Sequence, residues 1–222
     1  MASQLSLPYV DPKTKQALVN TEKWRAVLDF AAKVYQIPGN NQIATYGKAA
    51  EQMLGGTLAM YASLNDIMGY KLYSNPDVWD IATYPSWPEA PGLGTRVDAH
   101  AMGITSTSKH KQAAFKVIET ITSDEVQMMM SRRGKYPVLK DPKFGSSFGA
   151  DMGFMNNKNI EAIYKTKPAK TFIPTEYDNI AMKAMNGALS DIVKKGVDAN
   201  SALRQAEESI NKQIGELEAG SK

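Results

Sequence analysis

Apolar residues recur at helical spacing in several separate stretches of the chain. Thr21 can cap a first helix, which breaks at Pro38-Gly39. A second helix runs from Tyr46 to Leu54 and stops at Gly55-Gly56. The apolar face of the first helix consists of Trp24, Val27, Leu28, Ala31 and Tyr35. Each pattern predicts an amphipathic helix with one buried side.

The stretch Arg96–Pro137 carries the most detailed pattern: a strand, a polar turn and two helices. Thr122 and Glu125 have the spacing of a capping box, which predicts that a second helix begins there. Gly134 can adopt the left-handed conformation that ends it. The apolar face of the first helix is formed by Ala114, Val117, Ile118 and Ile121, and that of the second by Val126, Met129 and Met130.

Strands and helices alternate elsewhere too. Residues 57–62 and 78–84 are predicted as strands, and the proline-rich stretch 85–94 as a loop. One long helix begins near Thr175 and ends at Gly196, and Asp198 begins another that reaches Leu217. This alternation predicts an α/β fold rather than a helical bundle.

The same stretch resembles a known family. Its matching residues are Ile104-Thr-Ser-Thr-Ser-Lys109, Ala113-Ala-Phe-Lys-Val-Ile118, Ser123-Asp-Glu125 and Gly134, with Gly56-Thr-Leu-Ala-Met60 upstream. Over residues 20–217 the chain resembles the extracellular solute-binding proteins of ABC importers, the group that includes maltose-binding protein. The resemblance implies a periplasmic-binding-protein-like (type II) C-terminal lobe, helix-rich and incomplete relative to the intact two-lobed fold.

The resemblance also implies a domain plan. Residues 1–100 are expected to form the first part of the C-terminal lobe, 101–136 a segment that crosses to the N-terminal lobe, and 137–222 the closing helices. Intact members are about twice this length, which exceeds a usual single domain. We therefore expect a C-terminal piece of an extracellular lipoprotein, without its signal, its lipid-bearing cysteine and most of its N-terminal lobe.

Composition narrows the function classes. The 222 residues are 43% hydrophobic and 22% charged, which is ordinary for a globular protein. A net charge of +3, with Lys and Arg scattered among Asp and Glu, does not favour nucleic acid. Cysteine is absent. The first 16 residues lack the pattern of a signal peptide, so composition alone favours the cytoplasm, whereas the resemblance implies an extracellular location.

No catalytic or metal-binding motif is visible. The two histidines, His100 and His110, are ten positions apart, which does not form a zinc motif. Neither a Gly-x-Ser-x-Gly elbow nor a phosphate-binding Gly-Lys-Ser/Thr loop occurs, and Gly92-Leu-Gly94 is an incomplete dinucleotide fingerprint. We predict no enzyme activity, no metal and no cofactor, although carboxylates from distant segments could still meet.

A binding protein needs polar groups and aromatic faces around a cleft. The resemblance places ligand contacts after the strand ending at Met60, before the helix that begins near Lys109, and at the start of the penultimate helix. Trp87, in the proline-rich loop, is added as an aromatic platform. The predicted ligand-binding residues are Tyr61, Ser63, Asn65, Asp66, Trp87, Asp98, His100 and Tyr177.

Structural roles compete with these assignments. Tyr61 and His100 also fit half-buried strand positions, and Tyr177 can simply anchor its helix. Trp79, within a predicted strand, is expected in the core. Ser63, Asn65 and Asp66 can cap the helix that follows them. Sugar binders of the family often have Trp where this chain has Asn65-Asp66, which leaves a charged or peptide-like ligand open.

The function implied is non-catalytic capture of a small extracellular solute, in particular an oligosaccharide, and its delivery to the membrane permease of an ABC importer. Closing of two lobes around the solute would complete the site. Two alternatives remain open: a structural or protein-interaction domain, and a small glycan-acting hydrolase.

Overall fold

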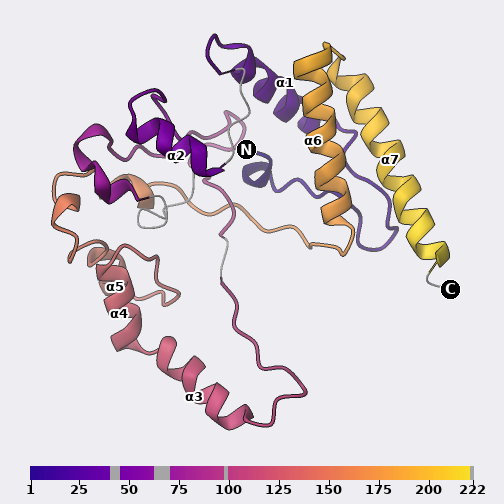
Figure 1. Cartoon of the computed structure of the whole chain (residues 1–222). Coiled ribbons are helices and arrows are strands. Elements are labelled where there is room, and N and C mark those ends of the chain that lie inside the picture. Colours follow the sequence, from indigo (N-terminus) through magenta and orange to yellow (C-terminus); the bar gives the residue numbers. More distant parts are fainter. Residues whose placement is uncertain (41–45, 63–70, 98–99, 221–222) are drawn as a thin grey trace. The chain divides into compact units, whose positions relative to one another are not determined.

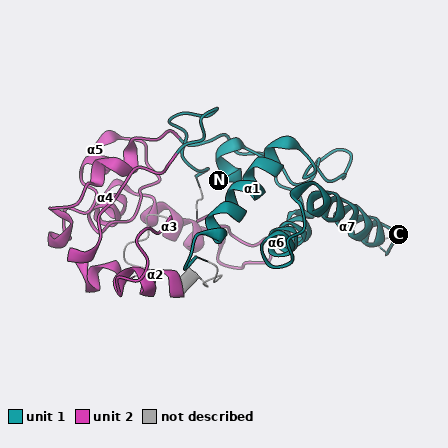
Figure 2. Cartoon of the chain, turned by 90° about the horizontal axis from the view of Figure 1, so that it is seen from above, with its two compact units in different colours: residues 1–43, 86–97, 168–222 teal, residues 44–85, 98–167 magenta. Residues whose placement is uncertain are grey.

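The computed structural model describes residues 1–40, 46–62, 71–97 and 100–220. Contacts divide the chain into two compact units, which Figure 2 distinguishes by colour. Unit 1 consists of residues 1–43, 86–97 and 168–222, and unit 2 of residues 44–85 and 98–167. Each unit therefore combines segments that lie far apart in the sequence.

Unit 1 is built on three long helices, of which α6 and α7 lie side by side (Figure 1). Thr21 caps α1: its hydroxyl oxygen accepts a hydrogen bond from the backbone N–H of Trp24 at 3.4 Å. Gly196, at φ 68°, ends α6, and the carboxylate of Asp198 accepts from the Ser201 N–H at the start of α7. The helices are η1 (Ala2–Leu5), α1 (Glu22–Gln36), α6 (Asp178–Lys195) and α7 (Ala199–Gly220).

The core of unit 1 gathers the apolar faces of these helices with the N-terminal segment. That segment turns at Asp11, whose carboxylate accepts from the N–H groups of Lys13 and Thr14, and Val10 faces Ala17 in an isolated antiparallel bridge. The apolar face of each of the three long helices is thus buried in this core. The buried residues are Leu7, Val10, Ala17, Val19, Trp24, Val27, Leu28, Tyr177, Ala181, Met185, Ala188, Ala202, Leu203, Ala206, Ile210 and Ile214.

Unit 2 contains shorter helices. In α4 the true cap is Ser123, one residue after the predicted Thr122, whose hydroxyl instead donates to the carbonyl of Ile118. At the other end Gly134 has φ 76°, and the Lys135 N–H donates to the Met130 carbonyl, so the predicted glycine stop is confirmed. The helices are α2 (Tyr46–Leu54), η2 (Leu72–Ser74), η3 (Pro76–Val78), α3 (Lys111–Ile121), α4 (Asp124–Arg132), α5 (Pro142–Ser146), η4 (Gly153–Met155) and η5 (Ile160–Tyr164).

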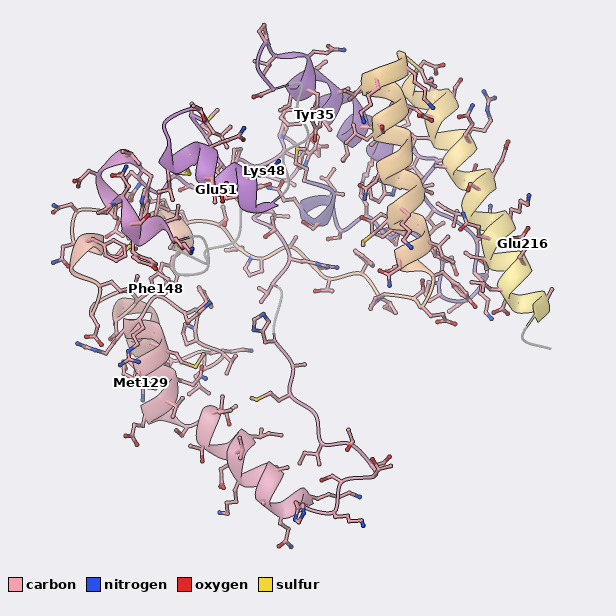
Figure 3. All side chains as sticks on the ribbon, in the orientation of Figure 1. Tyr35, Lys48, Glu51, Met129, Phe148 and Glu216 are labelled. Carbon is pink, nitrogen blue, oxygen red and sulfur yellow. The ribbon has the colours of Figure 1, made fainter. Side chains whose placement is uncertain are left out.

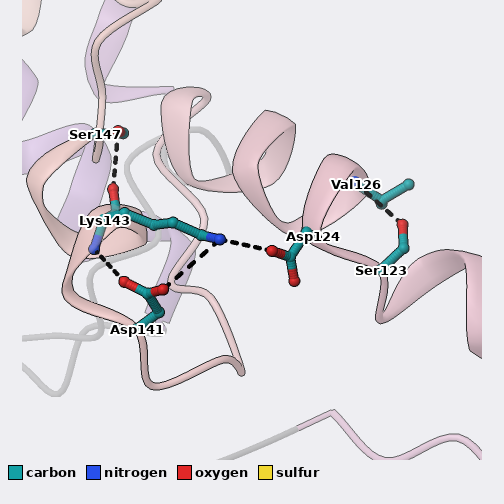
Figure 4. Close-up of polar contacts among 6 residues, drawn as sticks. All are labelled: Ser123, Asp124, Val126, Asp141, Lys143 and Ser147. Atoms are coloured by element: carbon teal, nitrogen blue, oxygen red, sulfur yellow. Dashed lines mark hydrogen bonds and ion pairs between the residues drawn. The ribbon is translucent and has the colours of Figure 1, made fainter.

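A lysine joins α4 to α5 (Figure 4). Lys143 Nζ lies 2.6 Å from a carboxylate oxygen of Asp124 and 3.6 Å from one of Asp141. Asp141 also caps α5, accepting from the Lys143 N–H at 2.9 Å. Because these groups are exposed, the ion pairs add little stability and mainly fix the relative position of the two helices.

A small hydrophobic cluster holds the rest of unit 2 together. It contains Trp79, confirmed as a core residue, whose indole N–H donates to the Leu72 carbonyl at 2.8 Å. Lys158 Nζ lies 4.8 Å from the centre of the Trp79 ring and donates to the carbonyl of Trp79. The cluster consists of Leu72, Trp79, Phe148, Met152 and Met155.

The predicted strands are wrong wherever the structure describes them. Residues 57–62 and 78–84 contain no strand, nor do the described parts of 96–104. Met60, expected in a buried strand, is 85% exposed. An extended segment becomes a strand only when another backbone pairs with it, and in the described part of the chain such pairing is limited to isolated bridges, for example between Val10 and Ala17.

Helix α3 forms where the period predicts it, yet its apolar face is only partly covered: Ala114, Ile118 and Ile121 are half-buried, and Val117 is exposed. None of its residues is buried, and Phe115 is 59% exposed. Figure 1 shows α3 next to α4. An open groove lies between this helix and Ile104. The helix thus has an amphipathic pattern without the burial that normally accompanies it.

Candidate functional site

Four of the eight predicted ligand-binding residues lie outside the described residues: Ser63, Asn65, Asp66 and Asp98. The remaining four are divided between the units. Tyr61 and His100 belong to unit 2, and Trp87 and Tyr177 belong to unit 1.

The two candidates in unit 2 are accessible. Tyr61 is half-buried, next to the exposed Met60, and His100 is exposed. Both lie in segments that are neither helix nor strand, so neither sits at the predicted strand positions. The imidazole of His100 and the ring of Tyr61 can supply a polar group and an aromatic face to a ligand.

Trp87 is held at the surface of unit 1. Its indole N–H donates to the Met1 carbonyl at 3.3 Å, and its ring lies edge-to-face with Phe30 at 5.7 Å between centroids. The ring is half-buried and packs against the unit 1 core. The exposed part of the ring, rather than its N–H, is what Trp87 can offer a ligand.

Tyr177 is buried in the core of unit 1. Its hydroxyl donates to the Glu218 carboxylate, which also accepts from Lys15 Nζ at 2.5 Å. This hydrogen bond to Glu218 raises the pKa of Tyr177, and the bond to the same carboxylate raises the pKa of Lys15. Glu218, near the end of α7, therefore joins Tyr177 at the start of α6 to Lys15 of the N-terminal turn.

Three further features of the described residues limit what they can do. Among the described residues, no group of three or more His, Asp or Glu side chains is placed to hold a metal ion. Every buried side-chain nitrogen or oxygen there has a hydrogen-bond partner. In the part of the chain the structure describes, no helix is long and apolar enough to cross a membrane.

Sequence reasoning missed a buried polar residue on α4. Gln127 is buried where the apolar pattern pointed to Met129, which Figure 3 labels on the same helix and which is exposed. The Gln127 amide donates to the Ile121 carbonyl at 2.9 Å and accepts from the Val138 N–H at 2.8 Å. It thereby fixes the chain that follows α4 against the end of α3. A periodicity that counts only apolar residues could not find it.

A pair of tyrosine rings was also missed. The rings of Tyr136 and Tyr164 lie 5.7 Å apart between centroids and are inclined by 31°. Tyr164 also packs edge-to-face on Phe148, labelled in Figure 3, at 6.3 Å. Partial burial, with a smaller contribution from Tyr136, raises the pKa of Tyr164 to about 12. Its hydroxyl thus stays protonated, and able to donate, well above neutral pH.

The Tyr164 hydroxyl should lose its proton at a higher pH than an ordinary tyrosine does. With tyrosine labelled at the ring carbon that bears the hydroxyl, NMR is expected to give a Tyr164 titration midpoint at pH about 12 in the folded chain and at pH about 10 in urea. Because the folded pKa is the higher one, this contribution to stability is complete below about pH 10 and is lost as the pH rises towards 12. Equal midpoints with and without urea would contradict the burial of this ring.

Comparison with known proteins gives a match of fold. No family model matches the chain. No curated protein matches it either. Among solved structures, the sugar-binding protein MalE from the phytopathogen Xanthomonas citri matches with a TM-score of 0.69 and 19% identity, over 97% of this chain and 56% of that one. A protein assigned as an oligosaccharide periplasmic-binding protein from Synechococcus sp. MITs9220 matches with a TM-score of 0.67 and 17% identity, over 96% and 56%.

The fold class follows from these matches. The chain has the fold of a portion of MalE-like periplasmic binding proteins, which confirms the predicted helix-rich, incomplete periplasmic-binding-protein-like architecture. It spans little more than half the length of either neighbour. At identities below one in five, the likeness concerns the fold.

Proposed function

We propose that this chain is part of a non-enzymatic protein that captures a small solute, in particular an oligosaccharide, outside the cytoplasm. The observation that carries the proposal is the fold match over nearly the whole chain to two proteins whose names state sugar or oligosaccharide binding. In the full-length form the protein would be a membrane-anchored lipoprotein. It would deliver the solute to the permease of an ABC importer.

The proposed contacts combine ring faces with polar groups. Trp87 would offer its exposed ring and His100 its imidazole, because these two groups are at least partly accessible. Tyr177 could reach a ligand only by giving up its bond to Glu218. The proposed ligand-binding residues remain Tyr61, Ser63, Asn65, Asp66, Trp87, Asp98, His100 and Tyr177. None of these contacts involves a covalent step.

The domain plan is proposed on separate grounds. Residues 101–136 would cross to an N-terminal lobe, while 1–100 and 137–222 would form the C-terminal lobe. The incomplete burial of the apolar face of α3 supports this, as does the absence of strand pairing for Ala101–Ile104 among the described residues. A helix beside an unpaired extended segment fits the edge of a sheet, which the helix would cover. Units 1 and 2 divide the chain elsewhere because they reflect only contacts made within it.

Binding by this chain alone should be weak, because a pocket closed by two lobes would have only part of its wall. In NMR titrations with maltotriose, cellotriose and xylotriose, we expect one sugar to shift the signals of His100 and Tyr61 at millimolar concentration. Calorimetry at micromolar concentration should give no measurable heat. His100→Ala should weaken the shifts, and His110→Ala, which changes the other exposed histidine of unit 2, should not.

Each outcome bears on a different part of the proposal. If no sugar shifts any signal, the proposed function fails. Micromolar affinity of the isolated chain would contradict the incomplete pocket and leave sugar binding standing. Equal effects of the two histidine variants would remove His100 from the site.

A further inference from the structure

Both tyrosines of the unit 2 pair are partly exposed to solvent. Tyr136 is 52% exposed and Tyr164 38% exposed. Neither ring belongs to the hydrophobic cluster of Leu72, Trp79, Phe148, Met152 and Met155, and Tyr164 only borders it through Phe148. Two large aromatic rings left side by side at a surface form a feature typical of recognition sites.

The Tyr136 backbone is held from both sides. Before it, Gly134 ends α4 with a positive φ, and a Cβ atom at this position would lie 2.8 Å from the sulfur of Met152. After it, Pro137 is buried, and the Val138 backbone N–H donates a hydrogen bond to the side-chain oxygen of the buried Gln127. A ring on a backbone fixed in this way loses little further freedom when a ligand covers it.

Tyr164 is fixed by packing. The edge of its ring packs against Phe148, which is almost fully buried, and Gly145 also lies close to the ring. The two rings therefore come from segments 28 positions apart, the end of α4 and the end of η5, and meet at one place on unit 2. The hydroxyl groups of both tyrosines can donate and accept hydrogen bonds.

We propose that Tyr136 and Tyr164 form a stacking platform for one sugar ring of an oligosaccharide, a subsite separate from the eight predicted contact residues. A pyranose ring has an apolar C–H face and a rim of hydroxyl groups. The apolar faces of the tyrosine rings can pack against the C–H face of the sugar, and the tyrosine hydroxyls can form hydrogen bonds with its hydroxyl groups. The inference rests on the proposed function, because it names a further subsite for the same class of ligand.

The platform can be tested with the chain itself. Tyrosine labelled with carbon-13 in the ring would be titrated with maltotriose, cellotriose and xylotriose and followed by NMR. The signals of both rings should shift with the sugar that also shifts His100. Tyr136→Ala and Tyr164→Leu should each raise the apparent dissociation constant by about 2- to 10-fold, the effect of one aromatic contact. Tyr73→Ala removes an exposed tyrosine of the same unit that is not part of the pair, and should change nothing.

The outcomes separate this inference from the proposed function. If a sugar shifts His100 while both tyrosine signals stay still, or if Tyr136→Ala binds as well as Tyr73→Ala, the platform is overturned and the proposed function stands. If no sugar shifts any signal, both are overturned. Broadening of the two tyrosine signals with protein concentration alone would show a protein contact surface instead, and would also overturn the platform.

Discussion

Replacing Ile210 with alanine should lower the free energy of unfolding of unit 1 by about 2–5 kcal/mol. The Ile210 side chain has no exposed surface and lies in the core formed by α1, α6 and α7. Removing it takes away buried apolar surface and leaves a cavity. The neighbouring helices cannot close this cavity easily, because Ala206 and Ile214 hold the same face of α7 in the core.

The measurement can be confined to unit 1. The chain has three tryptophans, of which Trp24 and Trp87 lie in unit 1 and Trp79 in unit 2. Fluorine NMR of the chain labelled with 5-fluorotryptophan would follow each of them in urea. The unit 1 signals of Ile210→Ala should change at lower urea than those of the parent chain. Met182→Ala, an exposed change on α6, should cost no more than about 0.5 kcal/mol. Equal losses in the two variants would show that Ile210 is not a core residue.

Helices were predictable because their signals are local. Thr21, Asp198 and the glycines at 134 and 196 act through backbone groups within a few residues of themselves. The apolar period then selects the face that is buried in α1, α6 and α7. A single sequence contains all of this information.

Neighbouring hydroxyl groups limited how precisely the first residue of a helix could be predicted. Thr122 and Ser123 can both cap α4, and the structure uses Ser123 while Thr122 completes the end of α3. The penultimate helix was predicted to begin near Thr175, but the Thr175 hydroxyl donates to the Asp178 carboxylate and α6 begins at Asp178. The short helix α5 was missed altogether, although Asp141-Pro142 is a typical helix start.

Strands could not be predicted in the same way, because they depend on a partner. The segment around Met60 has the composition of a buried strand, yet among the described residues no other segment pairs with it. Burial of such a segment is decided by a distant backbone that a local pattern does not reveal.

Prediction of the candidate site from the sequence was limited for a similar reason. Residue type and loop position suggested which side chains could contact a ligand, but not which of their atoms are already engaged. The bonds of Trp87 to Met1 and of Tyr177 to Glu218 join positions 86 and 41 residues apart. The same holds for the pair of Tyr136 and Tyr164, whose closeness depends on the folding of the whole segment between them.

Two phenylalanines in unit 2 show the difference between a core and an uncovered face. Phe144 on α5 is 1% exposed, and Phe115 on α3 is mostly exposed. The chemistry of the side chain is the same at both positions. If α3 packs on further polypeptide, as the domain proposal holds, Phe115 would matter for stability only when that polypeptide is present.

Phe144→Ala should therefore lower the free energy of unfolding of unit 2 by about 3–5 kcal/mol. Phe144 is buried on α5, which packs against α4. The Ser131 hydroxyl of α4 donates to the Phe144 carbonyl, and Lys143 Nζ lies 4.8 Å from the ring centre. Loss of the ring would leave a cavity beside the ion pairs that join the two helices. The fluorine signal of Trp79, the tryptophan of unit 2, reports the transition in urea.

Phe115→Ala is the matched control, because it removes the same atoms from an exposed position. In this chain it should cost no more than about 0.5 kcal/mol. A loss comparable to that of Phe144→Ala would mean that the face of α3 is already covered in solution, which would contradict both its exposure and its proposed role in crossing to another lobe. A small loss here, followed by a loss of several kcal/mol when the same change is made in a longer form of the protein, is the result that the domain proposal requires.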